Sequence, residues 1–105
     1  MNKTIQIPDL YKAFQNLKSG ELILDVRSPE EYATGHVPGS RNIPHDQVAS
    51  HKDALSKFEN VYVYCRSGGR VQMCCAELQN LGLTNISAVV GCGMPDWIAA
   101  GYPSK

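Results

Sequence analysis

The sequence has no excess charge of either sign and no long hydrophobic run. Ten Lys and Arg residues balance ten Asp and Glu residues, so the overall charge does not attract nucleic acid or an anionic membrane. The longest apolar runs, such as 22–24, fall far below the roughly 18 residues of a membrane-spanning helix. Residues 1–6 lack the continuous apolar segment of a secretory signal. These absences predict a soluble, cytoplasmic protein without a nucleic-acid or membrane partner.

The sequence lacks the cysteine spacing of a metal site. The four cysteines stand at positions 65, 74, 75 and 92, with no C-x-x-C pair and no histidine at finger-like spacing. This excludes the usual structural zinc patterns. Adjacent cysteines on a helix point to different sides of it, which favours reduced thiols over disulfides. We therefore expect no metal and no organic cofactor.

The length and composition predict one folded domain over residues 1–105. A chain of 105 residues is short for more than one domain. Hydrophobic residues make up 43% of it and charged residues 19%, without low-complexity runs, which argues against disorder. Strands are predicted at 4–7, 22–26, 40–43, 61–64 and 85–90. Helices are predicted at 8–18, 29–34, about 45–58, 71–81 and 96–100.

Strands that alternate with helices predict right-handed crossovers and a parallel sheet. In such sheets, ligands gather beyond the carboxyl ends of the strands. Cys65 follows directly after the clearest strand, V-Y-V-Y at 61–64, and a helix begins shortly after it. The loop that contains Cys65 is therefore the first candidate for a functional site.

The residues after Cys65 favour an anion-binding loop. The glycine pair Gly68 and Gly69 permits positive φ angles, so that successive amide groups converge on one point. The helix that follows adds the positive end of its dipole. Arg66 and Arg70 flank the glycines, and no carboxylate occurs between positions 59 and 77. Positive potential is thus concentrated at one place in a neutral chain.

This environment suits a cysteine nucleophile. Thiols at helix N-termini and beside arginines ionise more readily than free thiols, so we expect Cys65 to react as a thiolate without a separate general base. The same donors would stabilise the negative charge of a persulfide or of an oxyanion leaving group. The alternative is that Cys65 is a small buried residue at an ordinary strand-to-helix turn. The coincidence of cysteine, glycines, arginines and helix start favours the reactive thiol.

Three short motifs occur in order along the chain. These are L-D-V-R-S-P-E-E-Y at 24–32 with G-H-V-P-G-S at 35–40, C-R-S-G-G-R at 65–70, and W-I-A-A-G-Y-P at 97–103. Together they resemble the single-domain rhodaneses, which are sulfurtransferases, and the central run matches that family's C-R-x-G-x-R loop residue for residue. The resemblance covers about residues 10–103. It implies a rhodanese-like three-layer α/β domain, in which helices cover both faces of a central, mainly parallel sheet.

The resemblance also implies a reaction. Cys65 would take the outer sulfur of a small anionic donor such as thiosulfate and carry it as a persulfide to cyanide, a thiol or a protein acceptor. The two arginines would orient the donor, and the loop amides would hold the terminal sulfur. The substrate-binding residues implied are Arg66, Ser67, Gly68, Gly69 and Arg70.

Two other functions remain open at this point. One is a sulfur-relay carrier, whose Cys65 is loaded by a partner protein. The other is a phosphatase or arsenate reductase, because phosphatases of similar fold resemble C-x5-R. Only four residues separate Cys65 from Arg70, and Tyr64 stands where those phosphatases commonly have histidine. Both differences disfavour a phosphate-sized loop.

Three further residues are candidates for supporting roles. Asp25 and Arg27 end a strand on the same side of the sheet as the loop; Asp25 is expected to anchor a loop, and Arg27 to pair with Glu30 or Glu31. Cys92 departs from the family, which usually has glycine there. If its loop approaches Cys65, Cys92 would resolve an oxidised Cys65 into a disulfide. The alternative is a tolerated small residue.

Overall fold

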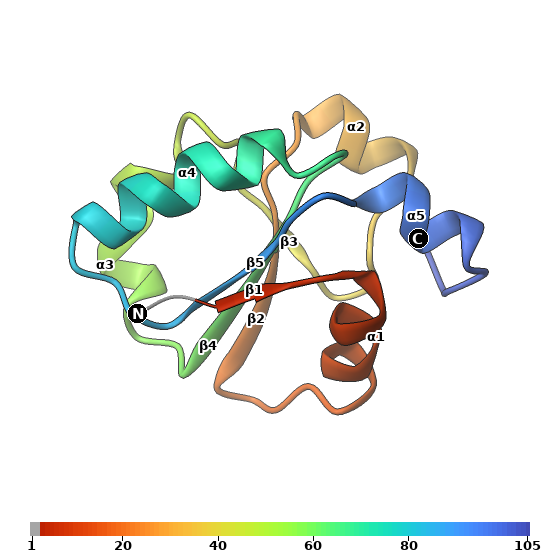
Figure 1. The fold of residues 1–105 in the computed structure, drawn as a ribbon, viewed down its shortest axis with the longest axis horizontal. Coiled ribbons are helices and arrows are strands. Elements are labelled where there is room, and N and C mark those ends of the chain that lie inside the picture. Colours follow the sequence, from red (N-terminus) through yellow and green to blue (C-terminus); the bar gives the residue numbers. More distant parts are fainter. Residues whose placement is uncertain (1–2) are drawn as a thin grey trace.

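The computed structural model describes residues 3–105 and shows one five-stranded sheet (Figure 1). Every strand pair is parallel, in the order β1-β5-β4-β2-β3. Residues 1 and 2 of the predicted domain lie outside the described part. The strands are β1 (Lys3–Ile5), β2 (Glu21–Asp25), β3 (Arg41–Asn42), β4 (Asn60–Tyr64) and β5 (Ile86–Val89).

Helices cover both faces of the sheet, which confirms the predicted three-layer α/β architecture. Figure 1 shows α1 and α5 on one side of the sheet and α3 and α4 on the other. None of the helices in the described chain is long and apolar enough to cross a membrane. The helices are α1 (Ile7–Gln15), α2 (Pro29–Thr34), the 3-10 turn η1 (Val48–His51), α3 (Lys52–Leu55), α4 (Gly69–Asn80) and α5 (Met94–Ala99).

The alternation of side chains along β4 determines which way Cys65 faces. Successive residues of a strand point to opposite faces of the sheet. Val61, Val63 and Cys65 accordingly belong to the core beneath α4, whereas Tyr64 belongs to the core beneath α1 and α5. Cys65 thus leaves the strand on the α4 side, directly before the loop that leads into that helix.

Tyr64 ties the turn before β3 to the centre of the sheet. Its buried hydroxyl accepts a hydrogen bond from the Val37 amide at 3.1 Å and lies 3.4 Å from the Ser40 hydroxyl. Burial is the main cause of a raised pKa for Tyr64, so its hydroxyl stays protonated. The residue before Cys65 therefore has a structural role, holding the turn at 37–40.

Helix ends are where the sequence-based expectations are wrong. Helix α1 ends at Gln15, so Leu17, expected on its apolar face, is 37% exposed. Leu81 caps α4 instead of continuing its apolar stripe and is 43% exposed. The predicted helix at 45–58 contains only η1 and α3. Cys74 and Cys75 are buried in the core, as expected.

Two leucines near α1 provide a matched test of this core. Leu10 is fully buried, and Leu17 lies beyond the helix end. We expect Leu10→Ala to lower the free energy of unfolding by about 2–5 kcal/mol, because it leaves a cavity. Leu17→Ala should change it by about 0.5 kcal/mol or less. Urea denaturation measures both, and equal losses would contradict the assigned end of α1.

Candidate active site

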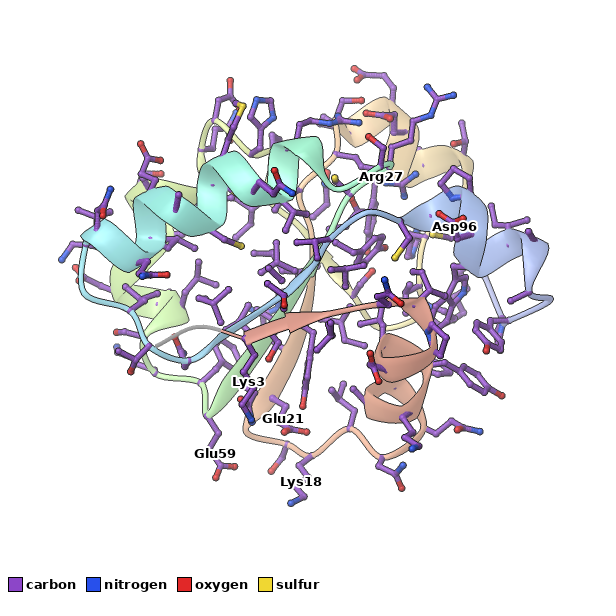
Figure 2. The ribbon with its side chains drawn as sticks, in the orientation of Figure 1. Lys3, Lys18, Glu21, Arg27, Glu59 and Asp96 are labelled. Carbon is purple, nitrogen blue, oxygen red and sulfur yellow. The ribbon has the colours of Figure 1, made fainter. Side chains whose placement is uncertain are left out.

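The segment 65–70 contains the loop that joins β4 to α4, residues 65–68, and the first two residues of α4, and it lies at the carboxyl end of the parallel sheet. Figure 2 shows Arg27 and Asp96 toward this end of the molecule, and Lys18, Glu21 and Glu59 at the opposite end. Cys65 is only 1% exposed, and its neighbour Arg66 is exposed. The thiol therefore lies at the bottom of the loop, with polar groups around the mouth.

A positive φ angle was expected for both Gly68 and Gly69, and the structure shows it for Gly68. Its φ is +97°, and its amide donates a hydrogen bond to Cys65 Sγ at 3.0 Å. Gly69 is already the first residue of α4 and has no positive φ. The left-handed residue turns the chain so that an amide at the helix N-terminus meets the sulfur.

A second loop, at 90–93, packs its backbone against the first. The Met94 amide donates to the Cys65 carbonyl at 2.9 Å. A Cβ atom on Gly93 would lie 2.2 Å from that carbonyl oxygen and 2.3 Å from the Arg66 carbonyl oxygen. A Cβ on Gly68 would lie 2.7 Å from the Gly91 nitrogen. Glycine is therefore required on both sides of this contact.

Sequence reasoning missed Gly93, which packs against the backbone of the loop that contains Cys65. The signal available was the G-C-G run at 91–93, directly before a helix and one strand away from the reactive loop. Which backbone Gly93 approaches becomes visible only when β5 and β4 are placed side by side.

Arg70 is bound by a carboxylate of α2. Its guanidinium donates to Glu31 Oε1 and Oε2 at 2.7 and 3.0 Å. The same carboxylate accepts the Ser28 amide at 3.1 Å, completing the capping box at the start of α2. The pKa of Glu31 is lowered from 4.5 to about 2, mainly because its carboxylate accepts hydrogen bonds from Arg70. One acidic side chain thus connects the start of α2 to the end of the reactive loop.

Arg27 pairs with Asp25, which corrects the expectation that it pairs with Glu30 or Glu31. Arg27 Nη2 lies 2.6 Å from Asp25 Oδ2, and both side chains are buried. The guanidinium also donates to the Gly35 carbonyl at 2.7 Å. The physical reason is local: in extended chain, residues two apart face the same side, and Glu31 is engaged by Arg70. Asp25 does anchor the segment after β2, accepting from the Arg27 amide.

Arg66 is the arginine of this region that keeps its charge unpaired. Among residues 3–105 its guanidinium makes no hydrogen bond or ion pair, whereas Arg27 and Arg70 are each neutralised by a carboxylate. Ser67 beside it is also exposed. The mouth of the loop therefore presents one full positive charge to solvent.

Cys92 lies in the second loop, but its sulfur packs on the other side of the sheet from the Cys65 sulfur. It contacts the α1 and α5 core, and its Sγ donates to the Val90 carbonyl at 3.4 Å. Cys65 belongs to the opposite core cluster. All four cysteines are free thiols. A redox exchange between Cys92 and Cys65 remains a prediction, and it would require Cys92 to reorient.

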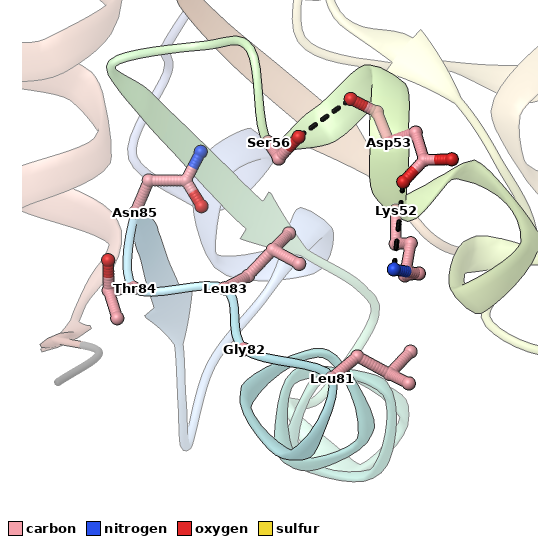
Figure 3. A pocket seen from close by; sticks show the side chains of 8 residues that line it. All are labelled: Lys52, Asp53, Ser56, Leu81, Gly82, Leu83, Thr84 and Asn85. Carbon is pink, nitrogen blue, oxygen red and sulfur yellow. Dashed lines mark hydrogen bonds and ion pairs between the residues drawn. The ribbon is translucent and has the colours of Figure 1, made fainter.

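A surface hollow of about 250 Å³ lies at the end of the sheet opposite the Cys65 loop (Figure 3). It is formed by α3 and the segment between α4 and β5, and its ion pair between Lys52 and Asp53 is exposed. Asn85 there holds the loop together through the Leu55 and Phe58 carbonyls. No cysteine or histidine lines this hollow. Within residues 3–105, no group of three or more His, Cys, Asp or Glu side chains is arranged to hold a metal ion.

Comparison with known proteins shows which protein family has this fold and this loop. The model of the rhodanese-like domain matches residues 8–100. The chain is 34% identical to thiosulfate sulfurtransferase 16, chloroplastic, of Arabidopsis thaliana, covering 85% of this chain and 83% of that protein. It is 37% identical to a putative sulfur carrier protein of Bacillus subtilis (strain 168), covering 71% of this chain and 40% of that one.

A solved structure agrees with these sequence matches. The rhodanese-related protein of Thermoplasma volcanium superposes with a TM-score of 0.82 at 32% identity, covering 98% of this chain and 97% of that one. The chain therefore belongs to the rhodanese-like family. In this chain, the C-R-S-G-G-R run at 65–70 lies where β4 leads into α4.

The contact between the two loops can be tested with two glycines. Gly93→Ala would bring a methyl group into the carbonyls of the reactive loop, and we expect it to lower the free energy of unfolding by about 1–3 kcal/mol. Gly69→Ala is the matched control, because a Cβ there meets nothing within 4 Å. It should leave stability unchanged or raise it by about 0.4–1 kcal/mol. A tolerated Gly93→Ala in urea denaturation would contradict the described packing.

The Glu31–Arg70 pair predicts a defined pH dependence. Because the pKa of Glu31 is lowered from 4.5 to about 2 on folding, its contribution to stability is complete above pH 4.5 and is lost as the pH falls toward 2. The difference in unfolding free energy between wild type and Glu31→Gln should shrink over that interval. Arg70→Gln should show the same trend, and the double variant should add little. A pH-independent difference would argue against the pair.

Proposed function

We propose that the protein is a sulfurtransferase that carries sulfur as a persulfide on Cys65. The observation that carries the proposal is the hydrogen bond from the Gly68 amide to Cys65 Sγ, in a four-residue loop at the N-terminus of α4. Such a loop offers oriented N–H donors to a sulfur anion. The relatives named as a sulfurtransferase and a sulfur carrier support the same chemistry.

The first half of the reaction loads Cys65 from a small anionic donor such as thiosulfate. The Cys65 thiolate attacks the outer sulfur of the donor, and a new S–S bond forms. The bond between the two sulfur atoms of thiosulfate breaks, and sulfite leaves with its electron pair. No external oxidant or reductant is needed. The outer sulfur keeps its oxidation level, and the oxidation of the Cys65 sulfur from thiolate to persulfide is balanced by the reduction of the sulfonate sulfur, which leaves as sulfite.

The loop is suited to the charges that this step moves. Arg66 is exposed and has no ion-pair partner in the described part of the chain, so it is the cation that would orient the sulfonate group. Arg70 uses N–H groups on both terminal nitrogens for Glu31, and its remaining N–H groups can still donate. The amides of residues 66–70 would hold the terminal sulfur. That atom lies about 2 Å beyond Sγ, the length of an S–S bond, and so extends toward the mouth.

The second half passes the outer sulfur to an acceptor. A nucleophile such as cyanide, a thiol or a sulfur-accepting protein attacks the terminal sulfur, and the electron pair of the broken bond returns to Cys65. Because Cys65 itself is buried, the projecting outer sulfur is the atom that an acceptor reaches most easily. Donor and acceptor therefore use the same mouth in turn.

A sulfur-relay carrier is the second candidate. The relative named as a putative sulfur carrier is 37% identical over 71% of this chain, and a carrier needs only the loading and delivery steps. In that case a partner protein would supply the sulfur, and thiosulfate would load Cys65 slowly. The distinction concerns the donor and leaves the role of Cys65 unchanged.

Sulfur uptake tests the proposal directly. After incubation with thiosulfate, we expect mass spectrometry to find one added sulfur atom on the wild-type protein and none on Cys65→Ser. Cys92→Ser is the matched control and should load normally, because its sulfur packs against the other core. Turnover to thiocyanate with cyanide identifies the enzyme, and loading with poor turnover identifies the carrier.

Two results would refute sulfur transfer through this residue. One is a Cys65→Ser variant that still gains sulfur at the wild-type rate. The other is phosphate release from an aryl phosphate without any sulfur uptake, which would assign the loop to phosphate chemistry.

A further inference from the structure

Arg70 lies close to the point where the reactive loop ends and α4 begins. Gly68 directly precedes the helix, and its carbonyl accepts a helical hydrogen bond from the Gln72 amide at 3.0 Å. Arg70 is the second residue of this first turn, whose residues are held together by the helical hydrogen bonds. A displacement of Arg70 is therefore passed on to Gly68. Because the Gly68 amide donates to Cys65 Sγ at 3.0 Å, the position of Arg70 affects the contact with the sulfur.

Glu31 holds Arg70 through both of its carboxylate oxygens. The guanidinium donates to Oε1 at 2.7 Å and to Oε2 at 3.0 Å. A forked pair of this kind fixes the direction of the guanidinium as well as its distance. Glu31 Oε1 also accepts hydrogen bonds from the amide and the hydroxyl of Ser28, at 3.1 and 3.2 Å. The carboxylate is thus fixed between the start of α2 and the first turn of α4.

The short helix α2, which carries Glu31, is held by polar contacts at both ends. None of its residues is buried, so it is not fixed by packing in the core. The Gly35 carbonyl at its end accepts a hydrogen bond from Arg27 Nη2 at 2.7 Å. Arg27 is in turn fixed by its buried pair with Asp25, the last residue of β2. Glu31 therefore stands on a support that is connected to the sheet.

The reactive loop is held by different contacts at its two ends. At its start, the Met94 amide binds the Cys65 carbonyl, and Gly93 packs against the same carbonyl. These contacts fix the backbone before the left-handed turn. The pair between Glu31 and Arg70 acts on the other side of that turn, at the beginning of α4. Both ends must be fixed for an amide within the loop to keep its direction toward the sulfur.

The charge of Glu31 does not itself favour a thiolate at Cys65. The pKa of Arg70 is raised, chiefly by the hydrogen bonds to Glu31 and to a lesser extent by negative charge at Glu31 and Cys65. A carboxylate that neutralises Arg70 weakens its attraction for a negative sulfur. Removal of the Glu31 charge should therefore not make the thiolate scarcer. An effect of Glu31 on position can thus be distinguished from an effect on ionisation.

We infer that Glu31 is a positioning residue for sulfur loading: through Arg70 it fixes the start of α4, and with it the amide that binds Cys65 Sγ. This inference rests on the proposed function, because it concerns the rate at which the same sulfur is loaded. Both oxygens of Glu31 accept hydrogen bonds in the folded protein. We therefore assign it no proton transfer and no contact with the donor.

The experiment measures single-turnover loading of Cys65 over a range of thiosulfate concentrations. Glu31→Gln removes the charged pair but keeps the size of the side chain, and glutamine also serves in capping boxes, so the start of α2 is preserved. We expect the rate constant at saturating thiosulfate to fall about tenfold, while the half-saturating concentration changes less than about twofold. Glu30→Gln is the matched control, because Glu30 is the exposed neighbour on the same helix, and it should keep the wild-type values.

A double-mutant cycle shows whether Glu31 acts through Arg70. Arg70→Lys keeps the positive charge but cannot form the forked pair, so it should also slow loading at saturating thiosulfate. The double variant should load no more slowly than the slower single variant. Losses that multiply in the double variant would show two independent roles and would overturn the inference.

Alkylation by iodoacetamide, located at Cys65 by mass spectrometry, measures ionisation separately. In Glu31→Gln, the pH profile of alkylation should stay in place or move to lower pH, because a negative charge has been removed. A profile that moves to higher pH, by enough to account for the slower loading, would assign Glu31 to thiol ionisation and would overturn the positioning role.

The outcomes separate this inference from the proposed function. Loading at the wild-type rate in Glu31→Gln, shown to be folded by circular dichroism, would overturn the inference alone. A change confined to the half-saturating concentration would make Glu31 a donor-binding residue and would also overturn it. A wild-type protein that gains no sulfur at Cys65 would overturn the proposed function and this inference with it.

Discussion

The close approach of two backbone segments is the constraint on which the site depends. The carbonyls of Cys65 and Arg66 lie where a side chain on Gly93 would have to stand, and the Met94 amide binds one of them. This contact holds the start of the reactive loop against the segment after β5. With that start held, the left-handed turn at Gly68 brings its amide to the sulfur. The proposed transfer of a single sulfur atom needs this precision, because hydrogen bonds weaken steeply with poor geometry.

Charge pairing around the loop complements this backbone contact. Two of the three arginines near Cys65 are bound by carboxylates, one in the buried pair with Asp25 and one in the pair that joins Arg70 to Glu31. These pairs connect the end of β2 and the start of α2 to the loop. Of these three arginines, Arg66 is the one that forms no ion pair within residues 3–105. In a chain of zero net charge, this arrangement leaves a positive charge at the mouth of the loop, where the proposed anionic donor would bind.

The sequence was informative where the signal is local in the chain. Each of the five predicted extended segments overlaps a strand of the sheet, and the predicted strand and helix on either side of Cys65 overlap β4 and α4, with ends that differ by one or two residues. Features that depend on neighbours in the folded structure could not be predicted from the sequence. The partner of Arg70 lies 39 residues away, and the need for glycine at position 93 appears only once two loops meet. The Asp25–Arg27 pair was within reach, because residues two apart in extended chain share a side.

Sulfur uptake by a loop-contact variant tests this account most directly. The initial rate of sulfur loading at Cys65 from thiosulfate should be measured for wild type and for Gly93→Ala, under conditions in which circular dichroism shows both to be folded. If the backbone contact positions the reactive sulfur, Gly93→Ala loads at least about tenfold more slowly, as expected for a displacement of about 1 Å at a reacting centre. Equal loading rates in the two folded proteins would contradict the central claim.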